Sequence, residues 1–333
     1  MSVPDRLREA ATRAMRASLL TLSRRRWLGR LATRLPVSRQ VVGRFIAGQT
    51  LDEALDVLEA VQGAGLLTTI DVLGEAVTSA ELARAAAGRY VDTLDALRAR
   101  GLEGNVSLKL SQMGLDVDPA QCRQNVARIF ARAAETGAFV RIDMEDHTKV
   151  DATLALWRDL RPVNPDSGVV VQSMLRRSES DIERLIGERA RVRLCKGAYQ
   201  EPPAAAYQEK AEVDASYARL MERLLLEGER PALATHDTRL IRAAVEIARR
   251  AGIDRDRVEF QMLYGVRRDL QQQLIDAGYR VRLYVPYGGE WYPYYMRRLA
   301  ERPANVAFIA GSLMREAERA VSARLGGTGR GRT

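Results

Sequence analysis

The stretch that decides the predicted fold is residues 104–144, GNVSLKLSQMGLDVDPAQCRQNVARIFARAAETGAFVRIDM. It begins with GNVSLKL (104–110) and ends with FVRIDM (139–144), two runs of β-branched and aliphatic residues of ordinary strand length. Between them, residues 121–135 are amphipathic and long enough for a helix that crosses from one strand to the next. This order predicts a βαβ unit with two parallel strands.

The same alternation continues on both sides of this unit. Further amphipathic stretches at 79–98 and 237–251 predict crossover helices of the same kind. The other six predicted strands are 66–73, 168–173, 191–196, 231–236, 257–262 and 280–285. Eight strands that alternate with helices indicate an α/β protein with a parallel sheet.

The predicted strands share one property at their carboxyl ends, which is a polar or hydrogen-bonding side chain. In a (β/α)8 barrel these ends meet on one face, where the active site is built. A barrel takes about 250 residues, so one barrel and an extra segment fit a chain of 333 residues. We therefore predict a TIM-type barrel with a site at this face, formed around Asp71, Lys109, Asp143, Gln172, Lys196, His236, Gln261 and Tyr284.

The net charge of +9 lies in the N-terminal region. Residues 1–50 hold eleven arginines and two acidic residues, so the remainder of the chain is balanced. Such a region is either a solvated helix face or a contact with an anionic membrane surface, and it somewhat resembles an organelle transit peptide. We predict a basic helical arm at 1–45 that is not cleaved, a barrel at 46–320 and a disordered tail at 321–333.

Composition excludes several other classes of protein. Two cysteines form neither a disulfide scaffold nor a zinc site of the usual spacing, and they favour a reducing, cytoplasmic location. The longest apolar runs are far shorter than the ~20 residues of a membrane-spanning helix. No GxGxxG follows a predicted strand, so a Rossmann domain is not indicated. We predict no metal site either: strand alternation points Asp143 and Glu145 the same way, but the oxygen ligands are too few.

Two segments carry residues suited to chemistry. Tyr294, Arg297, Arg298 and Glu301 share one helical face, and two adjacent arginines suit a bidentate carboxylate; the alternative is an exposed, salt-bridged helix. In RVRLCKGAY (191–199), Arg193 and Lys196 lie at the end of a strand, and Gly197-Ala198 lets a cofactor approach the backbone. Lys196 also suits a Schiff-base aldolase.

Two other side chains have competing interpretations. Lys109 and Asp143 form either a substrate clamp or a buried structural ion pair. A lone histidine such as His236 is more often a hydrogen-bonded structural residue than a base.

Taken together, these segments resemble the proline dehydrogenase family, in both its stand-alone bacterial enzymes and the corresponding domain of PutA-type proteins. The resemblance runs from about residue 45 to 308, and the match to the stand-alone enzymes is better. After Tyr199 this sequence has Gln200, where some members of the family carry Trp. The matching blocks, in order, are DVLGE (71–75), VSLKLSQMG (106–114), RIDMED (141–146), VVVQSMLRR (169–177), VRLCKGAY (192–199), ATHD (234–237), EFQMLYG (259–265) and VRLYVPYGGEWYPYYMRRLAERPAN (281–305).

The resemblance implies a distorted barrel whose eighth helix lies over the strand ends. It also implies FAD at the mouth and oxidation of L-proline to 1-pyrroline-5-carboxylate by hydride transfer from Cδ to flavin N5. By motif position, the substrate site would comprise Lys109, Asp143, Tyr199, Leu263, Tyr284, Tyr294, Arg297 and Arg298. FAD would be held by Gln172, Arg193, Lys196, Gly197, Ala198, Thr235, His236, Gln261, Arg298 and Glu301, with Arg193 next to N5.

The resemblance further implies a membrane quinone as electron acceptor, which gives the basic arm a role in peripheral contact with the membrane. It implies no nucleic-acid partner, and it leaves a homo-oligomer open. Two other interpretations remain: the Lys196 aldolase, and a basic adaptor that binds a membrane or nucleic acid through residues 1–50.

Overall fold

The computed structural model describes residues 43–74, 76–292, 294 and 296. The chain divides into two compact units, which are treated separately: Ala47–Gly288, and Met1–Ile46 together with Gly289–Thr333. Little of the second unit is described. The predicted tail and most of the predicted arm and eighth helix lie outside the described residues, so the predicted domain boundaries stay predictions.

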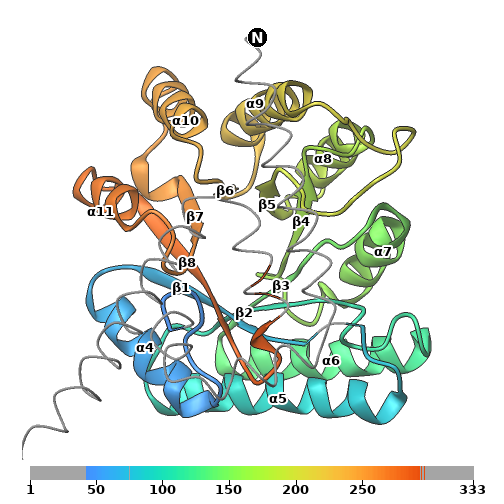
Figure 1. Cartoon of the computed structure of the whole chain (residues 1–333). Helices are drawn as coiled ribbons and strands as arrows, with labels where there is room; N and C mark the ends of the chain where they lie inside the picture. Colours follow the sequence, from blue (N-terminus) through green and yellow to red (C-terminus); the bar gives the residue numbers. More distant parts are fainter. Residues whose placement is uncertain (1–42, 75, 293, 295, 297–333) are drawn as a thin grey trace, which may run out of the picture. The chain divides into compact units, whose positions relative to one another are not determined.

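The Ala47–Gly288 unit is a closed barrel of eight parallel strands in the order β1-β2-β3-β4-β5-β6-β7-β8. Figure 1 shows the strands gathered in the middle, with helices placed around them. The predicted (β/α)8 barrel is confirmed. The strands are β1 Leu67–Val72, β2 Asn105–Leu108, β3 Phe139–Ile142, β4 Gly168–Gln172, β5 Arg191–Cys195, β6 Ala232–Ala234, β7 Glu259–Leu263 and β8 Arg280–Tyr287.

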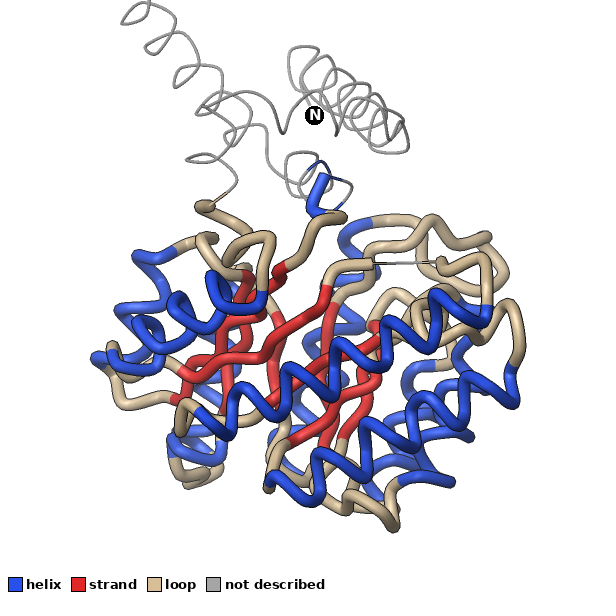
Figure 2. Tube along the Cα trace, turned by 90° about the horizontal axis from the view of Figure 1, so that it is seen from below, coloured by secondary structure: helices blue, strands red, loops and turns tan. Residues whose placement is uncertain are grey.

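The helices lie outside the ring of strands (Figure 2). Three of them agree with the amphipathic stretches of the sequence: α5 at 79–98, α6 at 121–135 and α10 at 237–251. The described helices are α4 Leu51–Gly63, α5 Ala80–Ala99, α6 Pro119–Thr136, α7 Val150–Leu160, α8 Ser178–Gly187, α9 Lys210–Glu227, α10 Thr238–Arg250 and α11 Arg268–Asp276, with short 3-10 turns η1 His147–Lys149 and η2 Arg255–Arg257. None of these described helices is long and apolar enough to cross a membrane.

Local signals explain where α6 begins and ends. The Asp118 side chain accepts a hydrogen bond from the Gln121 amide, and Pro119 occupies the first turn, where its missing N–H costs nothing. The helix ends at Gly137, whose left-handed φ of 69° is strained for any other residue. Its buried face, which includes Ile129 and Phe130, packs in the main hydrophobic core.

The inside of the barrel is unusually polar. A TIM barrel is ordinarily filled with branched aliphatic side chains, whereas here Arg141, Arg193, Gln261, Glu259 and Arg282 are buried on the strands. Arg193 of β5 bonds to side chains that follow or belong to β3, β2 and β7, which is possible only across the interior. The apolar core therefore lies between strands and helices, and the interior is a hydrogen-bonded network that leads to the mouth.

Candidate active site at the carboxyl ends of the strands

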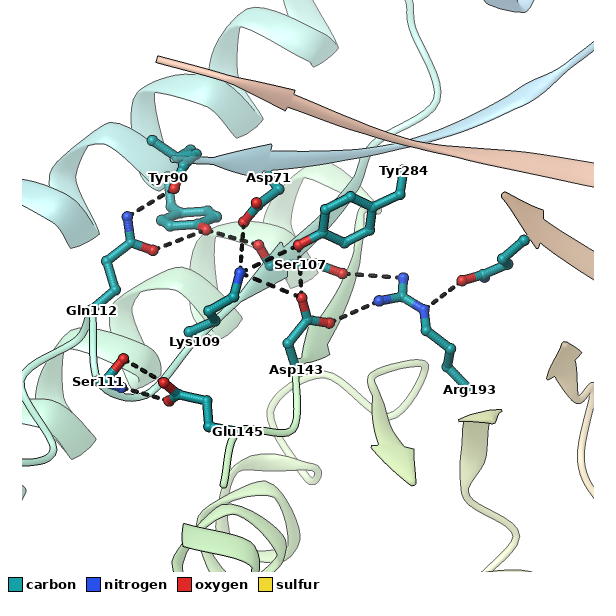
Figure 3. A network of polar contacts seen from close by, with 12 residues as sticks. Asp71, Tyr90, Ser107, Lys109, Ser111, Gln112, Asp143, Glu145, Arg193 and Tyr284 are labelled. Carbon is teal, nitrogen blue, oxygen red and sulfur yellow. Dashed lines mark hydrogen bonds and ion pairs between the residues drawn. The ribbon is translucent and has the colours of Figure 1, made fainter. Parts of the chain in front are cut away.

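Lys109 directly follows β2 and lies among three oxygen atoms at the barrel mouth (Figure 3). Its Nζ is 3.4 Å from Asp71 Oδ1, 3.4 Å from the Tyr284 hydroxyl and 3.8 Å from Asp143 Oδ2. The side chains of Lys109 and Asp143 are 14% and 11% exposed, so the ion pair is largely shielded from water. The predicted buried ion pair of Lys109 and Asp143 is thus present, and a substrate-clamping role stays a prediction.

Asp143 connects Lys109 to a second cation. It follows β3, and its backbone N–H continues the ladder by donating to the Leu108 carbonyl at 2.8 Å. Its Oδ1 accepts from Arg193 Nη1 at 2.7 Å, and its Oδ2 accepts from the Tyr284 hydroxyl at 2.8 Å. One carboxylate therefore fixes the guanidinium of Arg193 on β5 and the phenol of Tyr284 on β8.

Arg193 is held by three different partners. Its Nη1 bonds to Asp143, its Nη2 donates to Ser107 Oγ at 3.2 Å, and its Nε donates to Gln261 Oε1. Its guanidinium also lies 5.4 Å from the centre of the Tyr284 ring. With each of its three nitrogens engaged, the plane of the guanidinium is determined by the protein.

Tyr284 keeps its proton under ordinary conditions. Burial, followed by the negative charges of Asp143 and Asp71, raises the pKa of this phenol well above its usual value. The hydroxyl therefore accepts from Lys109 and donates to Asp143. Behind it, Tyr90 donates to the Ser107 carbonyl at 2.8 Å, and burial likewise raises the pKa of Tyr90.

Lys196 lies between two carboxylates. Its Nζ is 2.5 Å from Asp214 Oδ1 of α9 and 3.1 Å from Oδ2 of Asp237, whose other oxygen, Oδ1, caps α10. Burial raises the pKa of both carboxyls, but the hydrogen bonds and charges of Lys196, with Lys210 at Asp214 and Arg239 at Asp237, outweigh it, and both pKa values lie below their usual range. The Nζ of Lys196 is thus engaged by two carboxylates, whereas a Schiff-base lysine needs its Nζ available to attack a carbonyl carbon. This placement gives no support to the aldolase interpretation.

A cavity of about 590 Å³ adjoins this lysine. Both of its carboxylate partners line it, together with the first residues of the two helices. Cations and the amino ends of α9 and α10 face the same space. The lining residues are Glu209, Lys210, Ala211, Asp214, Asp237, Arg239 and Leu240.

The other predicted cofactor residues of the barrel lie on or just after β4, β5, β6 and β7. The buried Gln172 donates from Nε2 to the Glu145 carbonyl at 2.8 Å, and His236 Nε2 accepts from the Leu263 amide at 3.0 Å. An accepting Nε2 carries no proton, so the ring proton of His236 is on Nδ1. The hydrogen-bonded role that the sequence analysis favoured for this histidine is therefore observed, and contact with a cofactor stays a prediction.

The backbone conformation and the packing around position 197 both require glycine. The φ of Gly197 is 110°, and an added Cβ would lie 2.3 Å from Met174 Sδ. The conformation and the packing of the protein require glycine there before any cofactor is considered. Ala198, which follows it, is exposed, and Thr235 is buried just after β6.

The prediction that Asp143 and Glu145 point the same way was wrong. It assumed a strand through residue 144, but β3 ends at Ile142. Glu145 instead turns to Ser111, whose amide and hydroxyl donate to it at 2.9 and 2.5 Å, and burial raises the pKa of Glu145. In the described part of the chain, no group of three His, Cys, Asp or Glu side chains is arranged to hold a metal ion.

The structure brings most of the predicted site residues of the barrel to one end. Leu263 is half-buried at the end of β7 and pairs with Tyr284 of β8, while Tyr199 is exposed after β5. Tyr294 belongs to the other unit, and Arg297, Arg298 and Glu301 lie outside the described residues. The sequence placed Asp71 at the predicted mouth without a specific role, and it did not single out Ser107, Asp214 or Asp237 as site residues. Asp237 directly follows His236, the polar end of the sixth predicted strand, whereas no sequence signal pointed to Ser107 or Asp214.

Comparisons with a family profile and with curated proteins both match this chain to proline dehydrogenases. The profile of a family described as "Proline dehydrogenase" matches residues 54–311. The chain is 41% identical over 277 residues to a proline dehydrogenase of Deinococcus radiodurans, covering 82% of this chain and 89% of that protein. It is 39% identical over 271 residues to proline dehydrogenase 2 of Bacillus subtilis strain 168, covering 81% and 89%.

A solved structure is also similar to this chain. Proline utilization A (PutA) of Bdellovibrio bacteriovorus, solved after inactivation by N-propargylglycine, superposes with a TM-score of 0.73 at 28% identity. The alignment covers 79% of this chain and 32% of PutA, so this chain matches about a third of that longer protein.

Proposed function

Because the chain belongs to the proline dehydrogenase family, we propose that it is an FAD-dependent enzyme that oxidises L-proline to 1-pyrroline-5-carboxylate. Family membership establishes the oxidation of proline; the identity of the flavin, the product and the electron acceptor are our proposal. The observation that supports it most is the Lys109–Asp143–Arg193 network at the barrel mouth. Two oriented cations and a buried carboxylate suit an amino acid that carries both charges.

The residues present fit FAD in their chemistry. Gln172 and Gln261 present amides, and Thr235 a hydroxyl, for a flavin that both donates and accepts hydrogen bonds. The cavity beside Lys196 offers Lys210, Arg239 and two helix starts to phosphate groups. Of the three carboxylates in its lining, Asp214 and Asp237 are engaged by Lys196, Lys210 and Arg239, and Glu209 is the N-cap residue of α9. When bound, FAD supplies the two-electron acceptor, which no side chain of the protein can be.

The protein's own groups then bind, orient and shield the substrate. Lys109 would hold the carboxylate of proline together with Arg297 and Arg298, and Asp143 would keep Lys109 and Arg193 in place. Tyr284, Tyr199, Leu263 and Tyr294 would pack around the ring and exclude water from the reacting carbon. Gly197, Ala198, His236 and Glu301 complete the proposed FAD contacts.

A single spectroscopic experiment tests the proposal. The purified protein, reconstituted with FAD if necessary, should show an oxidised flavin spectrum that bleaches when L-proline is added without oxygen, and D-proline should leave it unchanged. Release of 1-pyrroline-5-carboxylate is then measured by its adduct with o-aminobenzaldehyde. A flavin that L-proline does not reduce would refute the proposed substrate, and failure to bind FAD would refute the cofactor.

We propose that the electrons pass on to a membrane quinone, with the basic residues 1–45 as the contact with an anionic lipid surface. The electron acceptor is tested by continuing the same spectroscopic experiment. A soluble quinone added to the proline-reduced protein should restore the oxidised spectrum faster than dioxygen does. Equal rates for the two acceptors would argue against a quinone.

Lys196→Met should weaken FAD binding about 10- to 100-fold, because it removes a cation and leaves Asp214 and Asp237 to repel a phosphate. The dissociation constant is measured by titrating the apoprotein with FAD. The matched control is Lys149→Met, which removes a lysine that also contacts two carboxylates, Asp146 at 3.0 Å and Asp116 at 3.4 Å, away from the cavity. Equal affinities in the two variants would contradict the proposed role of Lys196.

A further inference from the structure

Glu259 is a buried carboxylate that the proposed mechanism does not use. It starts β7, and the residue is 9% exposed. Its Oε1 accepts from Arg282 Nε at 2.9 Å, and its Oε2 lies 3.2 Å from Arg282 Nη2. A third bond comes from Gln261 Nε2, which donates to Oε1 at 2.6 Å. Glu259 therefore links a charge deep in the barrel to an amide on the same strand.

The hydrogen bond between Gln261 and Glu259 determines the orientation of the Gln261 amide. An ionised carboxylate only accepts hydrogen bonds, so the NH2 end of the amide must face Glu259. The carbonyl end then faces the other way, where it accepts from Arg193 Nε. If the amide were reversed, two donors would face each other at Arg193 and two acceptors at Glu259.

The Glu259 carboxyl group stays ionised near neutral pH. Burial raises its pKa, but the charge and hydrogen bonds of Arg282, with help from Gln261 and Arg141, lower it to about 2. The carboxylate is therefore always an acceptor near neutral pH, and the orientation of the amide does not depend on pH.

We propose that Glu259 is a positioning residue for proline oxidation: by orienting the Gln261 amide, it fixes the Nε–H of Arg193 and so aims the guanidinium at Asp143 and the mouth. The chain of contacts is Glu259 to Gln261, Gln261 to Arg193, and Arg193 to Asp143. Figure 3 shows its last link, in which Arg193 points at Asp143. This inference rests on the proposed function and on the contacts with FAD that the family resemblance implies for Arg193 and Gln261.

The test is Glu259→Gln, whose amide both donates and accepts and so no longer dictates the orientation of Gln261. We expect the rate constant of flavin reduction at saturating L-proline to fall about 10- to 100-fold, as for a misaligned reacting group. The dissociation constant for proline should change less than about threefold. In a readout independent of turnover, the dissociation constant for FAD should rise about fivefold, since one buried hydrogen bond is lost.

The matched control is Glu103→Gln. Glu103 contacts the same Arg282 at 2.9 and 3.0 Å but is not among the hydrogen-bond partners of Gln261. Both changes weaken the ion pairs of Arg282, so both lower the stability of the fold. The rate constant is measured on folded holoenzyme, so a loss of stability alone leaves it unchanged. Equal effects of the two variants on flavin reduction and FAD affinity would overturn the proposal.

A double-mutant cycle tests the route of the effect. If Glu259 acts through Gln261, Glu259→Gln should have little further effect on flavin reduction in a Gln261→Met background. A double variant slowed by the product of the two single effects would show that Glu259 acts independently, which contradicts the proposal. Should Glu259→Gln fail to fold, the wild type is compared with the double variant Glu259→Gln/Arg282→Met, which removes both charges of the buried ion pair together. Flavin reduction as fast as in the wild type would contradict the proposal.

The outcomes separate this inference from the function on which it rests. A wild-type protein that proline does not reduce would refute the proposed function itself. A wild-type protein that proline reduces normally, with Glu259→Gln reduced equally fast and binding FAD equally well, would refute only the role of Glu259.

Discussion

Asp143→Asn should slow the reduction of the flavin by L-proline about a hundredfold or more. The asparagine keeps the shape of the side chain but removes a negative charge that contacts both Lys109 and Arg193 at the mouth. Loss of one preorganised polar group at a reacting centre typically costs a factor of 10² to 10³ in rate. Proline should still bind, because the site gains net positive charge toward the carboxylate of the substrate. Stopped-flow absorbance over a range of proline concentrations separates the rate constant from the dissociation constant.

The control for this prediction is Asp159→Asn, the same chemical change at an exposed ion pair with Arg123 on the outside of the barrel. Its rate constant should match that of the wild type. A fall of less than about threefold in Asp143→Asn, or a fall equal to that of Asp159→Asn, would show that the Asp143 charge does not support the reaction.

Arg282→Met should be the most destabilising change in the barrel interior, with a loss of about 3–5 kcal/mol in the free energy of unfolding at neutral pH. Arg282 is 3% exposed and is the main counter-charge of the buried Glu259. Removing it leaves a carboxylate in a water-poor site, where an unpaired charge is costly. Denaturant unfolding of the apoprotein measures the difference.

The pH dependence of this difference follows from the pKa of Glu259, which is about 2 in the folded protein, against an ordinary value of 4.5. A lowered pKa contributes stability above the unfolded value, and this contribution is lost as the pH falls toward 2. The difference in the free energy of unfolding between wild type and Arg282→Met should therefore be largest near pH 7 and should decrease below about pH 4.5. If this difference in the free energy of unfolding did not change with pH, the ion pair of Glu259 and Arg282 would not be its cause.

The control is Arg100→Met. Arg100 also faces three carboxylates, Asp52, Asp56 and Glu59 at 3.8, 2.6 and 3.6 Å, but on the solvent-exposed surface. Exposed pairs contribute little, so this variant should unfold close to the wild type. A large loss in Arg100→Met would indicate that arginine removal is damaging regardless of burial.

The sequence by itself determined the barrel. Strand runs such as 139–144 and amphipathic stretches such as 121–135 are local patterns, and each corresponds to one element within a few residues. The polar residues at the strand ends also indicated the mouth, because parallel strands in a barrel present their carboxyl ends together. The same local logic failed for Glu145, since a strand that ends two residues early removes the alternation on which the prediction relied.

Only the tertiary structure decided which of these residues meet. Arg193, Asp143 and Ser107 come from β5, β3 and β2, and they touch because the strands close into a ring with one register. In the sequence, Glu259 is only a polar residue within the predicted strand 257–262. Its contact with Arg282 appears when β7 and β8 lie side by side. Periodicity and length act over a few neighbouring residues, whereas contacts across a barrel depend on closure and register, which no local pattern encodes.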